Sequence, residues 1–305
     1  MENKLNVLCY ISCAGPNVLY ENVEETITSI EKNINTNFKF FIHTDSEDHK
    51  IEINNIFKKL KLTQNLINIE VLNESWAFCF NKFYSEYKNE SEYILFSHDD
   101  LIIRTFDFFN IAMNEISGFE DEIGWIGFTS DSYYRIGGIA VQQSAREIFC
   151  KDRNTWPRTF ELHKMNNGYE ESLLDMPLRA CKVPGIFPHL MLIKSTNLEK
   201  IGLCPELGHY TILIDEHWSL QTLVKNMWTI WVPSVFYDHP IRGDQRRVQG
   251  LVNAEKAEVE FKKIWGFNYQ IPLTDQIIKE VCDRFPNTNI NFFNDKNTFD
   301  YQYLK

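Results

Sequence analysis

Apolar runs and helical patterns alternate along the first 130 residues of the chain. Short apolar runs predict strands at 5–12, 38–43, 68–72, 93–96 and 123–128. Apolar side chains at helical spacing predict helices between them, over 20–34, 51–60 and 76–87. Strands that alternate with helices are typical of βαβ units, so we expect an α/β fold with a mostly parallel central sheet.

This regular alternation stops after residue 128. The segment 137–188 is rich in polar and aromatic side chains and has no clear period, which is typical of functional or disordered segments. Regular patterns return and predict strands at 190–194 and 228–232, and helices over 196–201, 215–226, 253–265 and 274–285. We therefore expect a main α/β domain over 1–240 and a loop with a helical extension over 241–305.

Charge and cysteine usage narrow the classes of function. The formal net charge of −11 excludes a general attraction to nucleic acid, so any phosphate ligand must be held by a metal ion or a local basic cluster. The seven cysteines are scattered and form no CxxC pair, which argues against a disulfide scaffold or a zinc ribbon. A reducing cytoplasm is the simplest location for such a chain.

Acidic residues follow two of the predicted parallel strands. His98, Asp99 and Asp100 come directly after the apolar run at 93–96, and Asp45 follows the run at 38–43. Ligands of open α/β sheets bind at the carboxyl ends of the strands, where we expect these residues to lie. Mg²⁺ and Mn²⁺ take oxygen ligands and bridge to diphosphates, so the residues at 98–100 are candidate metal ligands; a solvated turn is the alternative.

A second polar group follows the apolar segment at 232–238. His239 comes at its end, and Arg242, Arg246 and Arg247 follow. The imidazole of His239 can complete a metal site, and guanidinium groups clamp phosphate oxygens. The alternative is a histidine on the surface beside a solvated basic turn.

Two neighbouring carboxylates, Asp215 and Glu216, open the helix predicted after residue 214. Such a carboxylate serves either as a helix cap or as a general base beside a bound substrate. Adjacent helical side chains point about 100° apart, so we expect only one of the two to serve a given site.

In this order and spacing, the motifs resemble the GT-A fold glycosyltransferases, most closely the inverting family 2 group. The resemblance covers about residues 5–240, with a donor half over 1–130 and an acceptor half over 131–240. His98-Asp99-Asp100 stands at the position of the family's DXD motif, with His98 in place of the first acid. Asp215 stands at the position of the family's catalytic aspartate, and Ile214 replaces the glutamate that commonly precedes it in the family.

The resemblance implies a role for each candidate residue. Asp215 would be the catalytic base, with Glu216 as the fallback, and Asp100, His239 and His98 would hold Mn²⁺ or Mg²⁺. The donor would be a nucleotide-diphosphate sugar, with UDP as the expected carrier. Its binding residues would be Ser12, Asp45, Asn81, His98, Asp99, Arg242, Arg246 and Arg247.

The expected function is transfer of a sugar, with inversion, to a hydroxyl of a glycan, glycolipid or glycoprotein in polysaccharide synthesis. We expect a cytoplasmic enzyme and leave open a peripheral association with the inner face of the membrane. Aromatic residues in or near 137–188, among them Tyr133, Tyr134, Trp156 and Tyr169, would shape the acceptor pocket. Two alternatives stay open at this stage: a retaining transferase on the same fold, and a non-catalytic module that binds sugar nucleotides or carbohydrate.

Overall fold

The computed structural model describes residues 4–15, 18–130, 179–183, 189–204, 214–238, 257–266 and 302–304. The strands are β1 (Leu5–Cys13), β2 (Phe38–Thr44), β3 (Leu66–Val71), β4 (Ser91–His98), β5 (Ile102–Ile103), β6 (Ile123–Ser130), β7 (Cys181–Val183), β8 (Leu190–Lys194), β9 (Trp228–Asp238) and β10 (Gln302–Tyr303). The helices are α1 (Tyr20–Asn33), α2 (Glu47–Lys59), η1 (Thr63–Asn65), α3 (Trp76–Tyr87), α4 (Phe108–Ile116), α9 (Ser195–Ile201) and α10 (Ile214–Val224), together with residues 257–265.

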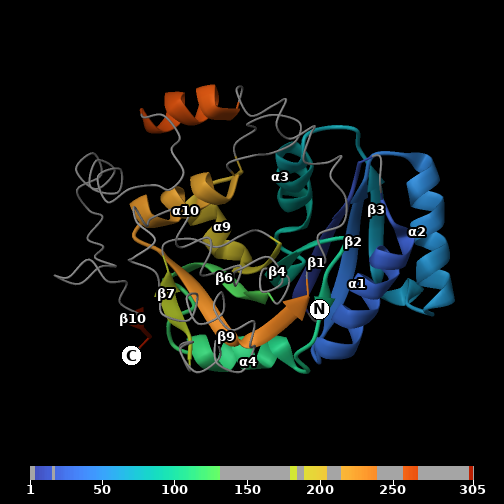
Figure 1. The fold of residues 1–305 in the computed structure, drawn as a ribbon, viewed down its shortest axis with the longest axis horizontal. Helices are drawn as coiled ribbons and strands as arrows, with labels where there is room; N and C mark the ends of the chain where they lie inside the picture. The colour runs from blue at the N-terminus through green and yellow to red at the C-terminus, as the bar shows by residue number, and fades with distance from the viewer. Residues whose placement is uncertain are drawn as a thin grey trace, which may run out of the picture.

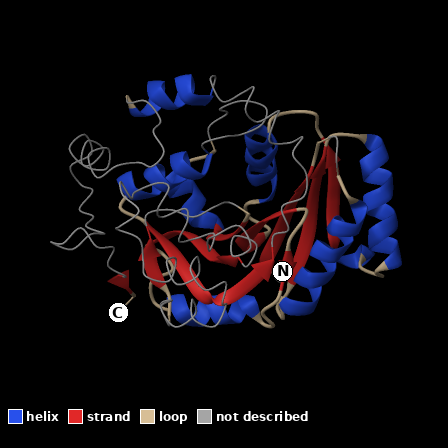
Figure 2. Cartoon of the chain, viewed as in Figure 1, coloured by secondary structure: helices blue, strands red, loops and turns tan. Residues whose placement is uncertain are grey.

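The described strands form one sheet that helices cover on both faces (Figures 1 and 2). Its order is β10-β7-β9-β6-β8-β4-β1-β2-β3, and β5 pairs with β9 outside this path. β3, β2, β1 and β4 are parallel neighbours, β6 is parallel to β9, and β8 runs antiparallel between β4 and β6. The expected α/β fold with a mostly parallel sheet is confirmed.

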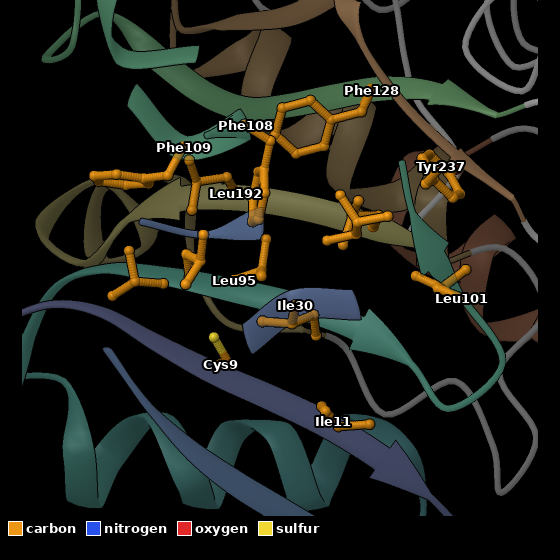
Figure 3. Packing of buried hydrophobic residues seen from close by; sticks show 14 of the residues in the cluster. Cys9, Ile11, Ile30, Leu95, Leu101, Phe108, Phe109, Phe128, Leu192 and Tyr237 are labelled. Carbon is orange, nitrogen blue, oxygen red and sulfur yellow. The ribbon is translucent and has the colours of Figure 1, made fainter. Parts of the chain in front are cut away.

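The apolar side chains of β1 alternate between two separate cores. Val7, Cys9 and Ile11 point to the face that α1, α2 and α4 cover, and Figure 3 shows part of this core. Leu8 and Tyr10 point to the face that α3, α9, α10 and the 257–265 helix cover. Successive strand residues point to opposite faces, so a strand buried on both sides must be apolar at every position. This burial explains why the strands appear in the sequence as continuous apolar runs.

Two element boundaries differ from those expected. α2 begins at Glu47 rather than near residue 51, because the Ser46 side chain caps it by accepting a hydrogen bond from the backbone N–H of His49 (3.2 Å). The sequence predicted that this strand ends at residue 232, before Pro233, but β9 continues to Asp238. A register shift between Phe128 and Thr129 on β6 accommodates the proline, whose carbonyl accepts a hydrogen bond from Thr129 Oγ1 (3.2 Å).

Several short elements were not predicted from the sequence, namely α4, β5, β7 and β10. β7 falls inside the segment 137–188 that was expected to be irregular. The rest of this segment, apart from residues 179–180, lies outside the described residues. The predicted helix over 274–285 also lies outside them. In the described part of the chain, none of the helices is both long and apolar enough to span a membrane.

Gly124 on β6 sets the distance between the sheet and α10. A Cβ at this position would lie 2.4 Å from Thr222 Cγ2 and 3.1 Å from Ile201 Cδ1. Both neighbours belong to helices on the same face, α10 and α9. The missing side chain therefore allows these helices to pack directly against the strand.

We expect Gly124→Ala to lower the free energy of unfolding by about 1–3 kcal/mol, because an added methyl group overfills this contact. Thr222→Ser removes the nearest methyl group and keeps the hydroxyl that donates to the Trp218 carbonyl (2.7 Å). In urea unfolding, the double variant should recover part of the loss, which gives a favourable coupling in the double-mutant cycle. Strictly additive effects would show that the Gly124–Thr222 contact does not set this spacing.

Candidate functional site

Polar side chains form a row across the carboxyl ends of three parallel strands. Ser12 on β1 pairs in register with His43 on β2 and with His98 on β4. Residues in register on neighbouring strands point to the same face of a sheet. Tyr10, two residues before Ser12, belongs to the core under α3 and α10, so the row continues that face to the edge of the sheet.

Ser12 and His43 form a hydrogen-bonded pair. The hydroxyl of Ser12 lies 3.2 Å from His43 Nδ1, and His43 Nε2 lies 3.0 Å from the carbonyl oxygen of Leu72. A carbonyl oxygen only accepts, so the proton of the neutral ring is on Nε2 and Ser12 donates to Nδ1. Burial lowers the pKa of His43 and keeps the ring neutral. The lone pairs of Ser12 are thereby oriented to accept a hydrogen bond from a ligand.

Asp45 follows β2 at the same edge and holds the loop after β1. Its Oδ2 accepts a hydrogen bond from the backbone N–H of Gly15 (2.7 Å), and its Oδ1 lies 3.0 Å from His49 Nδ1. Gly15 has φ = 112°, a backbone conformation that favours glycine. The carboxylate of Asp45 remains partly exposed (26%), so it can contact a ligand while it holds this turn.

The three residues of the DXD-like motif lie in different environments at the end of β4. Asp99 is buried (3% exposed), whereas His98 and Asp100 are partly exposed. The backbone N–H of His98 donates to the carbonyl oxygen of His189 (2.9 Å), and the two imidazole centroids are 4.9 Å apart. The sequence pattern gave no signal for His189, because it stands alone before β8 and only the pairing of β8 with β4 brings it beside His98.

The chain after Asp100 pairs with the end of β9. Ile102 and Ile103 of β5 lie opposite Asp238 and Tyr237. Arg104 Nε donates to Asp238 Oδ2 (2.7 Å), and the guanidinium and the carboxylate form an ion pair. The residue before His239 is thus fastened to the segment that follows the DXD-like motif. His239 itself lies outside the described residues, as do Arg242, Arg246 and Arg247.

Asn81 on α3 uses its carboxamide to hold the chain after α9. Its Nδ2 donates to the carbonyl oxygen of Cys204 (2.7 Å), and its Oδ1 accepts from the backbone N–H of the same residue (3.0 Å). This pair of bonds gives Asn81 a structural role. Its assignment to donor binding stays a prediction.

Asp215 and Glu216 are in the first turn of α10, and their side chains lie outside the described part of the structure. The helix itself is held by aromatic side chains. Trp218 is buried, with its ring centroid 4.6 Å from Trp125 on β6 and 5.6 Å from Trp76 on α3. Trp76 in turn lies 4.9 Å from Phe96, two residues before His98. These contacts connect α10 to β4 through Trp76 on α3.

The side chains at the end of β4 include ligands that suit a divalent cation. The carboxylate of Asp100 and the imidazole of His98 are ligands that Mn²⁺ accepts, and Mg²⁺ takes the carboxylate. Within the described ranges, no three His, Cys, Asp or Glu side chains form a ready metal-binding group. Of the three predicted metal ligands, Asp100 and His98 are among the described residues, and His239 is not.

No family model and no curated protein matches this chain. Among solved structures, it is similar to GalNAc-T7 with UDP, GalNAc and Mn²⁺, with a TM-score of 0.56, 14% identity and coverage of 80% of this chain and 44% of the other. It is also similar to the mannosyltransferase PcManGT from Pyrobaculum calidifontis in complex with GDP-Man and Mn²⁺, with a TM-score of 0.55 and 12% identity. This second match covers 92% of this chain and 69% of the other.

The chain has the GT-A glycosyltransferase fold. It spans less than half of the GalNAc-T7 chain that it matches. In this GT-A fold, β1, β2, β4 and β9 run in the same direction. Their carboxyl ends therefore lie at one edge of the sheet. This edge holds the row of Ser12, His43 and His98 and the pairing of β5 with β9.

The helix at 257–265, called the C-terminal helix below, contacts α10 through His217. Trp265 Nε1 donates to His217 Nδ1 (3.1 Å), and both side chains are buried. Burial lowers the pKa of His217 to about 4, although a hydrogen bond with Gln221 partly offsets this effect. His217 is therefore neutral at physiological pH, which the bond from Trp265 requires.

We expect the folded protein to lose stability as the pH falls from 6.5 to about 4, since only the unfolded state binds a proton at His217 in this window. A pKa difference of this size corresponds to roughly 3 kcal/mol at the lower end of the window. Urea unfolding of the wild type and of His217→Asn at several pH values measures the effect. If both proteins lose stability equally between pH 6.5 and 4, His217 is not the group that titrates.

Proposed function

We propose that this chain transfers a sugar from a nucleotide-diphosphate donor to an acceptor hydroxyl, with a divalent metal ion and with inversion at the anomeric carbon. The observation that carries the proposal is the convergence of four strand ends. Ser12, Asp45 and His98-Asp99-Asp100 lie at the carboxyl ends of β1, β2 and β4, and the end of β9 is tied to this edge through Arg104 and Asp238. Ligands of open α/β sheets bind at such an edge.

Ser12 and Asp45 would bind the nucleoside part of the donor. The Ser12 hydroxyl donates to His43, so its lone pairs can accept a hydrogen bond from a ribose hydroxyl. The Asp45 carboxylate accepts a bond from Gly15 and has room for a second donor on the ligand. UDP and GDP-Man in the two similar structures support a nucleotide-sugar donor here.

Asp100, His98 and His239 would hold the cation, and Asp99 would contribute to the diphosphate site. A cation bound there would stabilise the charge that develops on the leaving diphosphate. Mn²⁺ in both similar structures supports a divalent ion. Arg242, Arg246 and Arg247 supply guanidinium groups suited to the phosphate oxygens, and they follow Asp238, which Arg104 fastens at this edge.

Asp215 would act as the general base, with Glu216 as the alternative. The acceptor hydroxyl gives its proton to the carboxylate, and its oxygen forms a bond to the anomeric carbon of the sugar. The bond between that carbon and the diphosphate oxygen breaks, and the nucleoside diphosphate leaves with the electron pair. Trp218, three residues after Asp215, packs against Trp76, which in turn packs against Phe96 on β4.

The acceptor class is a further part of the proposal. A glycan, a glycolipid or a glycoprotein offers the hydroxyl that the reaction needs. We expect the product to be part of polysaccharide synthesis. We expect the enzyme to work in the cytoplasm, either free or associated with the inner face of the membrane. Tyr133, Tyr134, Trp156 and Tyr169, which we expect to shape the acceptor pocket, lie outside the described residues.

We expect UDP or GDP to bind in calorimetry only when Mn²⁺ or Mg²⁺ is present, and Asp100→Asn to weaken this metal-dependent binding at least tenfold. Asp121→Asn is the matched control, because Asp121 is an exposed acid paired with Lys194 before β6, at the amino end of that strand. Equal weakening in both variants would point to general electrostatics and argue against a specific site. Binding without any dependence on metal would contradict the proposed role of Asp100.

Asp215→Asn should abolish sugar transfer and leave metal-dependent donor binding intact, because the amide cannot accept the acceptor proton. Screening sugar nucleotides for transfer or slow donor hydrolysis identifies the donor for this assay, and NMR of the product gives its anomeric configuration. Full activity of Asp215→Asn with loss in Glu216→Gln would move the base to Glu216. A retained anomeric configuration would contradict the inverting mechanism, and donor binding without turnover would indicate a non-catalytic binding module.

A further inference from the structure

The helix at 257–265 belongs to the predicted C-terminal extension, after the residues 5–240 that carry the sequence motifs. Its buried side chains are Ala257, Phe261 and Trp265, and every other residue in it is exposed or partly exposed. Residues four apart lie on one face of a helix, so the three form a single stripe. The helix ends at Trp265 because Gly266 adopts φ = 79°, a conformation typical of a helix C-terminus.

This stripe belongs to the same buried cluster as α10. Phe261 and Trp265 pack in the core that includes Trp218, Leu220 and Leu223. A polar link within this contact is the bond from Trp265 Nε1 to His217 Nδ1, with the two ring centroids 5.4 Å apart. A hydrogen bond between buried groups is directional, whereas apolar packing alone allows a helix to slide or rotate.

His217 is two residues after Asp215 in α10. Residues two apart on a helix point about 200° apart, so the bond from Trp265 reaches α10 on the side away from position 215. Trp218, one residue further on, packs against Trp125 and Trp76. The first turn of α10 is therefore held between the sheet and the C-terminal helix.

We propose that Trp265 and His217 are positioning residues that set the orientation of the first turn of α10, and with it the carboxylate that serves as general base. This inference rests on the proposed function, because it concerns the same base. It assigns a contribution to the reaction to a helix that carries none of the residues proposed for binding or catalysis. Small displacements of a general base lower the reaction rate strongly, whereas the residues proposed for donor binding lie at the ends of other elements, β1, β2 and β4.

The test compares variants that remove the hydrogen bond with variants that keep it. Trp265→Phe preserves an aromatic ring and removes the N–H donor, and His217→Leu removes the acceptor. His217→Asn keeps an acceptor, since its Oδ1 lies near the position of Nδ1. Phe261→Leu is the packing control, because it trims the same stripe and leaves the bond in place.

We expect Trp265→Phe and His217→Leu to lower kcat about tenfold with KM for the donor within about twofold of wild type. His217→Asn and Phe261→Leu should retain most of kcat. Hydrogen exchange should become faster for amides at 217–223 in the first two variants and stay unchanged in α3. Unchanged kcat in Trp265→Phe, or an equal loss in Phe261→Leu, would overturn the proposal.

The exchange measurement separates this inference from the proposed function. If no variant and no wild-type protein turns over any donor, the transferase proposal fails by itself. Exchange at 217–223 then still decides whether Trp265 orders α10: faster exchange in Trp265→Phe supports this ordering, and unchanged exchange overturns it.

Discussion

Burial of the central sheet on both faces is the constraint on which the rest of this structure depends. The side chains of β1, β2 and β4 are mostly apolar where helices cover them, and polar side chains, some of them buried, appear mainly toward the strand ends. In β1 this point is Ser12, which is partly exposed and pairs in register with His43 and His98. The polar edge of the sheet is thus a direct result of where the two cores end.

The same constraint explains how α10 is placed. Gly124 and the indole rings of Trp125 and Trp218 let this helix pack closely on the sheet, and Trp76 extends the aromatic contacts to Phe96 on β4. A rigid aromatic connection therefore joins the helix with the candidate base to the strand with the candidate metal ligands. In the proposed reaction the base and the leaving group must be held at a set separation, which such a connection provides.

Much of the fold followed from local patterns. The bounds of β1, α1 and α3 match the expected ones closely, because continuous apolar runs and helical spacing are strong signals. α4 was missed, although Asp107 before it is a residue type common at helix starts; here Asp107 has a left-handed backbone (φ = 59°) and makes no side-chain cap bond. β9 was predicted too short because Pro233 is tolerated only through the register shift on β6.

The sequence by itself determined the fold class and the positions of Asp45 and of His98-Asp99-Asp100 at strand ends, since both follow from the period of apolar residues. Only the tertiary structure decided the partners of these residues. Three hydrogen bonds join residues that are far apart in the sequence. Ser12 and His43 are separated by 31 positions, His217 and Trp265 by 48, and Arg104 and Asp238 by 134. Such contacts arise from strand register and helix packing between distant segments, and no local pattern of residues specifies them.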